Sequence, residues 1–202
     1  MDQTEADRAL AIIRQVVDHT RDDLVAQNWG LLWIIHAFTN FTAFLVNGFW
    51  VEPGGFPARF YLLPLGVSAF VNVVAILLLL PRDRGARSFV EAQMNGIWLS
   101  FIGVTALAAL AIDTAGLPPS AFFFVITSGS ATGFAAMGVV FQRRYFAATA
   151  AFCIVLLLGG PLAAQRWTAL GAVWWSVLFG VGLSMHRARA ARRQSPEIAR
   201  IL

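Results

Sequence analysis

Six apolar segments follow one another along the chain, and each is about as long as a membrane-crossing helix. They cover residues 29–50, 60–80, 95–116, 120–142, 145–162 and 167–186. About 20 apolar residues in a helix cross the hydrocarbon core of a bilayer, and the fifth segment is near the short limit. Because lipid offers no hydrogen bonds to a bare backbone, such segments cross as helices. The pattern predicts an all-α polytopic membrane protein, a bundle of six transmembrane helices.

The first 28 residues show a different pattern. Apolar positions recur there at the three- and four-residue steps of one helix face, at Ala9, Ile13, Val16, Val17, Thr20 and Leu24. The other face is charged, and in this segment acidic side chains outnumber basic ones. We expect residues 1–28 to form an amphipathic cytoplasmic helix that precedes the bundle. Since helices that bind anionic lipid are usually rich in Lys and Arg, this one is expected to dock on a soluble protein.

The composition supports a membrane protein. Of the 202 residues, 58% are hydrophobic and only 13% are charged, whereas ordinary soluble domains have about 25% charged residues. The mean hydropathy is +0.67. This apolar surplus exceeds what one soluble core buries and suits a surface solvated by lipid. The lipid bilayer is therefore the first expected partner, and six spans leave no room for a second domain.

The positions of the arginines predict the orientation. The net charge is +4, and every basic side chain other than histidine is arginine. Arginines gather in loops 82–87 and 143–144 and in the tail 187–202, whereas the alternate loops carry only Arg59 and Arg166. Because basic residues favour the cytoplasmic side, we expect a cell inner-membrane protein with both termini cytoplasmic. No nucleic-acid partner is expected, since no basic stripe with interleaved aromatic residues lies outside the apolar segments.

The apolar segments also pair into three hairpins. Each hairpin has a Gly/Pro turn on the predicted outer side, at 53–55, 116–119 and 159–161, and an arginine-containing exit on the inner side. An internal threefold repeat is one explanation. The favoured explanation is that short outer turns need Gly and Pro and inner exits need Arg in any case, since no residue identity aligns between hairpins.

Polar side chains within the apolar segments are the best clue to a site, because they are costly in lipid unless they are paired. At a rise of about 1.5 Å per helical residue, Asn40 and Asn72 both lie near the middle of the bilayer. The candidate substrate or cavity residues are His36, Asn40, Asn47, Ser68, Asn72, Thr105, Ser128 and Ser130. We expect the first, second and fourth segments to form a polar interior, with the fifth facing lipid.

Three interpretations of this polar layer stand side by side. The favoured one is hydrogen bonding across helix interfaces, which Ser, Thr and Asn commonly provide in membranes. A cavity for a small solute or a lipid headgroup is the second. A catalytic site is the weakest, because no serine lies in a G-x-S-x-G motif. Gly129 and Gly133 have the GxxxG spacing of close helix packing, either within the chain or at the dimer face of a homo-oligomer.

The ionisable residues of the apolar segments bear on haem binding, proton-linked roles and ion pairs. His36 is the only histidine inside the apolar core, and haem ligation would need a second one at matching depth, whereas His186 lies at the cytoplasmic end. A neutral His36 bonded to a neighbouring helix is favoured over a proton-linked role. Asp113 lies near the outer end of the third segment, where it is expected to meet Arg59 or Arg166.

These features predict a non-enzymatic membrane protein that serves as a scaffold or as a regulatory or accessory subunit. The acidic N-terminal helix and the basic tail would supply its contacts with partners. The first alternative is a small-solute transporter or channel that uses the midplane layer, and the second is an intramembrane enzyme acting on lipid. The single cysteine, Cys153, excludes an internal disulfide and a CxxC zinc site, and we expect no metal and no cofactor.

Overall fold

The computed structural model describes residues 28–79, 89–140 and 142–194, and this part of the chain is helical, with no strand. The elements are α2 (Trp29–Val46), the π-helical turn η1 (Asn47–Val51), the 3₁₀-helical turn η2 (Ala58–Tyr61), α3 (Leu62–Leu79), α4 (Phe89–Thr114), α5 (Ala121–Val140), α6 (Tyr145–Leu158) and α7 (Arg166–Gln194). The all-α prediction is thus confirmed. The amphipathic helix predicted for residues 1–28 lies, except for Asn28, outside the described residues.

Five helical segments of the described chain are long and apolar enough to cross a membrane. They are Trp29–Val51, Ala58–Leu79, Ala92–Thr114, Ala121–Val140 and Arg166–Ala191. The apolar helix α6 is shorter, at 14 residues. The first segment continues through the π-helical turn and the last runs past its predicted end, because α7 continues to Gln194. The predicted basic tail therefore begins inside a helix, and residues 195–202 are outside the described part.

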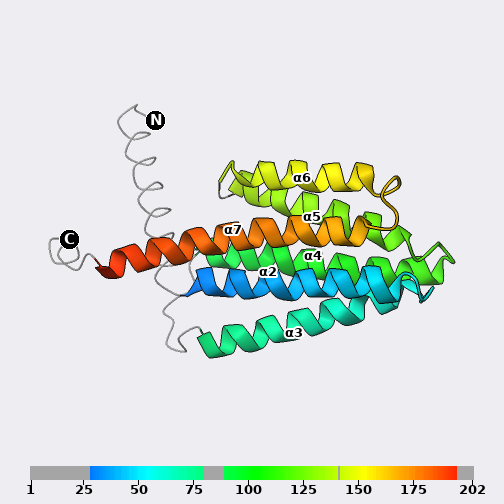
Figure 1. Cartoon of the computed structure of the whole chain (residues 1–202), viewed down its shortest axis with the longest axis horizontal. Helices are drawn as coiled ribbons and strands as arrows, with labels where there is room; N and C mark the ends of the chain where they lie inside the picture. The colour runs from blue at the N-terminus through cyan, green and yellow to red at the C-terminus, as the bar shows by residue number, and fades with distance from the viewer. Residues whose placement is uncertain (1–27, 80–88, 141, 195–202) are drawn as a thin grey trace, which may run out of the picture.

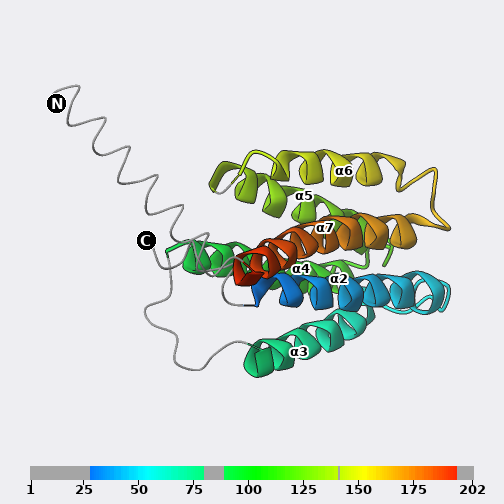
Figure 2. The same cartoon turned by 60° about the vertical axis from the view of Figure 1, so that its left-hand side comes forward.

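The helices lie side by side in one elongated bundle (Figure 1). α3 lies at one edge and α6 at the other, and the view in Figure 2 agrees. The most extensive contact joins α2 to α7, followed by the contacts of α5 with α6 and of α2 with α3. The start of α2 and the end of α7 lie together, at what we call the basic end. We call the opposite end, where η1 and η2 lie, the Glu52 end.

Two glycines explain how closely α2 and α7 approach each other. A Cβ on Gly30 would lie 2.8 Å from the carbonyl oxygen of Gly182, and a Cβ on Gly182 would lie 2.7 Å from the carbonyl oxygen of Gly30. Backbone therefore meets backbone at this crossing. In a membrane, where apolar side chains gain little by leaving lipid, such close packing is a main source of helix association.

Aromatic rings of α7 form the centre of the bundle. Trp174 is buried, and its ring centroid lies 5.4–6.3 Å from those of Phe44, Trp98, Phe101, Phe134 and Phe152. Trp167 is seven residues earlier on the same helix and lies 5.2–6.4 Å from the rings of Phe44, Tyr61, Phe122 and Phe123. These clusters connect α7 with α2, α4, α5, α6 and η2.

The burial of the helices corrects the expected arrangement in one respect. Half of the α5 span is buried, as expected for a helix with small and polar residues on most sides, whereas only 17% of the Ala58–Leu79 span is buried. The second segment therefore faces the interior only along the side that carries Ser68 and Asn72, which are both buried. The polar residues of α3 form their interhelical hydrogen bonds with a single neighbouring helix, α2. The rest of α3 forms an edge of the bundle.

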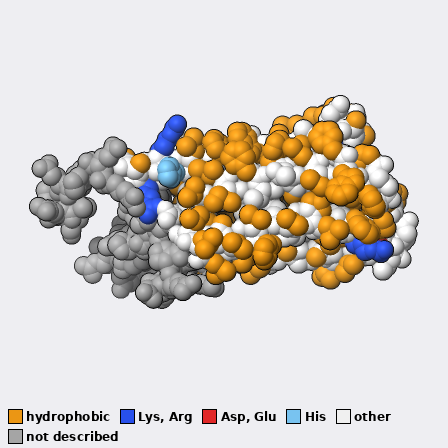
Figure 3. All heavy atoms as spheres, turned by 60° about the horizontal axis from the view of Figure 1, so that its bottom comes forward, with side chains coloured by type: hydrophobic (Ala, Val, Ile, Leu, Met, Phe, Trp, Pro, Cys, Tyr) orange, Lys and Arg blue, Asp and Glu red, His pale blue; other side chains and the backbone are white. Residues whose placement is uncertain are grey.

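The surface has the distribution of a membrane-spanning protein. Hydrophobic side chains cover the middle of the face shown in Figure 3, and basic side chains lie at its two ends. Large apolar side chains such as Leu78 and Leu157 are each 78% exposed. An apolar band of this kind between charged ends is stable in lipid and would be an aggregation surface in water.

Candidate functional site

A buried set of polar side chains joins α2 to α3. The Ser68 hydroxyl donates to Asn40 Oδ1 at 3.0 Å, and Asn72 Nδ2 donates to Thr39 Oγ1 at 3.0 Å and to the Ser68 carbonyl oxygen at 2.9 Å. Ser68 and Asn72 are one helical turn apart, so both face the same neighbouring helix. We call these four residues the α2–α3 polar cluster. Their polar groups bond one another within the apolar band.

A second polar contact joins α5 to α7. The indole Nε1 of Trp174 donates to Ser130 Oγ at 3.2 Å, and Ser130 Oγ in turn donates to the Ile126 carbonyl oxygen at 2.6 Å. Ser130 is fully buried. The contact gives the central tryptophan a partner for its only polar atom, which a buried indole needs.

The other candidate residues lie apart from these contacts. His36 and Ser128 are exposed, and the Ser128 hydroxyl donates within its own helix, to the Val125 carbonyl oxygen at 3.0 Å. Thr105 is buried on α4. The structure thus divides the predicted layer into separate local contacts. The two buried serines among the candidates, Ser68 and Ser130, donate to Asn40 and to the α5 backbone.

Gly129 and Gly133 lie against the aromatic side chains of α4. A Cβ on Gly129 would lie 3.0 Å from Cε2 of Phe101, and a Cβ on Gly133 would lie 3.4 Å from Cζ3 of Trp98. Both rings also contact Trp174. In this structure the two glycines therefore make room for aromatic side chains within the chain.

Asn47 lies at the Glu52 end, away from the α2–α3 polar cluster. It is fully buried, and its Nδ2 donates to the Tyr61 carbonyl oxygen at 3.2 Å. The backbone carbonyl oxygen of Asn47 accepts a hydrogen bond from the Glu52 backbone N–H at 2.9 Å. This bond joins residues five positions apart and defines the π-helical turn. Turns of this kind inside helices are frequent at functional sites.

Two ion pairs join the turns at the same end. Arg59 pairs with Asp113 at 3.4 Å, and the Asp113 carboxylate also accepts from the backbone N–H groups of Ala58 at 2.6 Å and Arg59 at 3.2 Å. The prediction that Asp113 meets Arg59 or Arg166 is confirmed, and Arg59 is its partner. Arg166 pairs with Glu52 instead, and its guanidinium lies 5.3 Å from the ring centroid of Phe123.

Three buried polar atoms at this end have no hydrogen-bond partner among the described residues. They are Asn47 Oδ1, Arg166 Nε and Trp167 Nε1. Asn47 Oδ1 can accept a hydrogen bond, and Arg166 Nε and Trp167 Nε1 can each donate one. This end therefore has hydrogen-bonding groups that the contacts between α2 and α3 do not use. Sequence reasoning named Asn47 but missed the Glu52–Arg166 pair. The available signal was the opposite charge of Glu52 and Arg166, which lie in turns predicted to be on the same side of the membrane.

The arrangement contains hydrogen bonds and ion pairs that hold helices together, and none of the contacts described above forms a nucleophile–base pair. Within the described residues, no group of three or more His, Cys, Asp or Glu side chains is placed to hold a metal ion. Comparisons with protein-family models, with curated proteins and with solved structures find no match to this chain.

Proposed function

We propose that the chain crosses the cell inner membrane six times, with α6 as the additional span. α5 ends at the basic end and α7 begins at the Glu52 end, so the chain between them has to traverse the bundle (Figure 1). The 14 residues of α6 cover about 21 Å at 1.5 Å per residue. The turn at 159–165 then supplies the remaining depth. A short span of this kind is accommodated by local thinning of the bilayer or by flanking residues.

Both chain ends are proposed to be cytoplasmic. The basic end carries Arg143 and Arg144 in the turn before α6, and Arg187 and Arg189 in the last part of α7. At the opposite end, Arg59 and Arg166 are each paired with a carboxylate. Because arginines near the ends of membrane spans favour the cytoplasmic side, the end with more of them is assigned to the cytoplasm.

The function we infer is that of a non-enzymatic scaffold or accessory subunit. The observation that supports it best is the pairing of the α2–α3 polar cluster. The polar groups that a solute path would need bond one another across the helix interface, which is how polar residues stabilise membrane bundles. Partner contacts would come from the net acidic segment 1–28 and the basic tail at 187–202.

Water access to the α2–α3 polar cluster tests this proposal. Cys153 is the only cysteine, so Cys153→Ser provides a cysteine-free background. In that background, Ser68→Cys and Asn72→Cys are treated with a small water-soluble thiol reagent in vesicles. We expect both thiols to be protected, whereas Leu117→Cys in the exposed α4–α5 turn reacts fully.

Reaction of Ser68→Cys or Asn72→Cys at a rate near that of Leu117→Cys would contradict the scaffold proposal. It would show that water reaches the middle of the bundle, as the transporter or channel alternative requires. A melting measurement on each variant in detergent excludes the trivial case in which the substitution itself opens the helix interface.

A further inference from the structure

A groove of about 320 Å³ lies between α6 and α7, towards the basic end. Its walls are mostly apolar and are formed by Ala147 and Ala148 of α6 and by Val177, Gly180 and Val181 of α7, with Ser184 of α7 nearer the basic end. A Cβ on Gly180 would meet no atom within 4 Å, so the space beside it is open. α6 packs much more extensively on α5 than on α7, which leaves this side of the helix pair uncovered.

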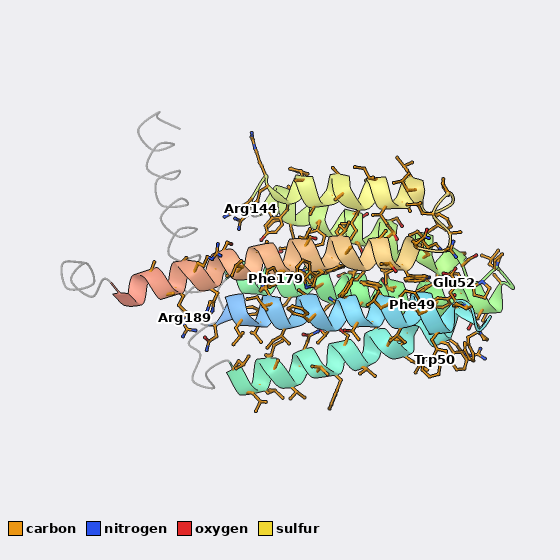
Figure 4. All side chains as sticks on the ribbon, viewed as in Figure 1. Phe49, Trp50, Glu52, Arg144, Phe179 and Arg189 are labelled. Atoms are coloured by element: carbon orange, nitrogen blue, oxygen red, sulfur yellow. The ribbon has the colours of Figure 1, made fainter. Side chains whose placement is uncertain are left out.

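The groove has a charged mouth and an apolar body. Arg144 lines it where α6 begins, and Figure 4 shows this residue at the basic end of the bundle, the end that also carries Arg189. The Arg144 guanidinium lies 5.6 Å from the ring centroid of Tyr145. The positive end of the α6 dipole adds to the positive potential at this mouth. One turn deeper the lining is apolar.

We propose that the groove binds an anionic phospholipid from the leaflet at the basic end. One acyl chain lies along the apolar walls, and the headgroup phosphate lies on Arg144. Guanidinium groups bind phosphate oxygens through charge-assisted, often bidentate, hydrogen bonds. The groove carries its positive charge at the mouth and its apolar walls deeper in the membrane. A phospholipid in that leaflet has the same order, with the headgroup phosphate at the surface and the acyl chains below it.

The size and charge of the groove favour this occupant. The volume is at the lower end of the range for small-molecule sites, about 300–1,000 Å³, and is suited to part of a single chain. Basic pockets between transmembrane helices are known to hold anionic headgroups. The proposal goes beyond the scaffold role and does not depend on it, since it needs only that the bundle lies in a membrane.

Retention of lipid tests the proposal directly. The full-length protein is reconstituted in vesicles of equal phosphatidylglycerol and phosphatidylcholine, extracted into mild detergent, and its bound lipids are counted by native mass spectrometry. For Arg144→Gln we expect the ratio of retained phosphatidylglycerol to phosphatidylcholine to fall about fivefold, the effect of one arginine near an anionic lipid. Gly180→Leu, which fills the groove, should lower the retention of both lipids. Arg59→Gln at the Glu52 end is the matched control and should change neither.

An unchanged lipid ratio in Arg144→Gln, or wild-type retention in Gly180→Leu, would overturn the proposal. Ala147→Leu replaces Gly180→Leu as the filling variant if the latter melts below wild type. A last arm gives the lipid-free protein inorganic phosphate alone. Phosphate binding that Arg144→Gln abolishes and Gly180→Leu leaves intact, without selective lipid retention, would identify a free-phosphate site and contradict the lipid assignment.

Discussion

At the scale of single residues, several polar side chains of this protein link particular helices. Asn40 Oδ1 accepts a hydrogen bond from the Ser68 hydroxyl, and Asn72 Nδ2 donates one to Thr39 Oγ1. Trp174 Nε1 donates one to Ser130 Oγ. The sequence correctly indicated that Ser68, Asn72 and Ser130 face protein, because unpaired polar groups are costly in lipid. His36 and Ser128, which it also named, are exposed. It did not indicate which residue would bond which, since partners depend on helix rotations that apolar residues elsewhere determine.

The Asn40–Ser68 hydrogen bond should make a small and specific contribution to stability. In a double-mutant cycle with Asn40→Ala and Ser68→Ala, we expect a coupling free energy of about 0.6 kcal/mol, the average for such bonds in membranes. Denaturant unfolding in mixed micelles measures it. Ser128→Ala is the control and should be nearly neutral, because its hydroxyl is exposed and bonds only its own helix. A coupling indistinguishable from zero would count against the hydrogen bond as a stabilising contact.

At the scale of elements, α7 organises the bundle more than any other helix. It crosses α2 backbone to backbone and carries both central tryptophans. The helices themselves could be predicted, because each corresponds to a long apolar run in the sequence. The role of α7 was missed, although the spacing of Trp167 and Trp174 by two helical turns was visible. The GxxxG spacing of Gly129 and Gly133 predicted close packing of α5. The backbone-to-backbone crossing instead joins Gly30 of α2 and Gly182 of α7, which are far apart in the sequence.

The glycine crossing should be the position most sensitive to a single methyl group. In Gly182→Ala the new Cβ meets the Gly30 carbonyl oxygen at 2.7 Å, so the two helices have to separate. We expect the free energy of unfolding to fall by about 1–3 kcal/mol, the usual cost of overpacking. Thermal unfolding in detergent provides the measurement.

The control for this prediction lies two residues away on the same helix. Gly180→Ala makes the same change in helix propensity but meets open space. It should be neutral or slightly stabilising, because alanine favours a helix over glycine by about 1 kcal/mol. Equal melting temperatures for the two variants would mean that the close approach of α2 and α7 contributes nothing to stability.

At the scale of the whole molecule, the bundle has two chemically different ends. One end collects arginines before α6 and along the end of α7, and at the other end both arginines are paired with carboxylates. The membrane class and the presence of the helices followed from the sequence, because they depend on summed hydrophobicity. The edge position of α3 and the separation of the polar residues into local contacts depended on three-dimensional packing and did not follow from it.

The two ends should lie on opposite sides of the membrane. In the Cys153→Ser background, Leu117→Cys at the Glu52 end should react with a membrane-impermeant maleimide added to intact cells. Arg143→Cys at the basic end should react only after the membrane is permeabilised, because basic turns favour the cytoplasm. The reverse pattern would invert the proposed orientation while leaving the bundle itself unaffected.

The contact between α2 and α7 also has a consequence for biosynthesis. α2 is made before α7 and has its most extensive contact with it, so α2 has to wait in the membrane while the helices between them are made. At the usual 5–20 residues per second, this delay amounts to roughly ten seconds or more. Nascent chains that stop before α7 would leave the glycine face of α2 uncovered and the aromatic centre unfilled. The synthesis of α7 is then the event that closes the bundle, and chains that lack α7 should be recognised by membrane quality control as unassembled.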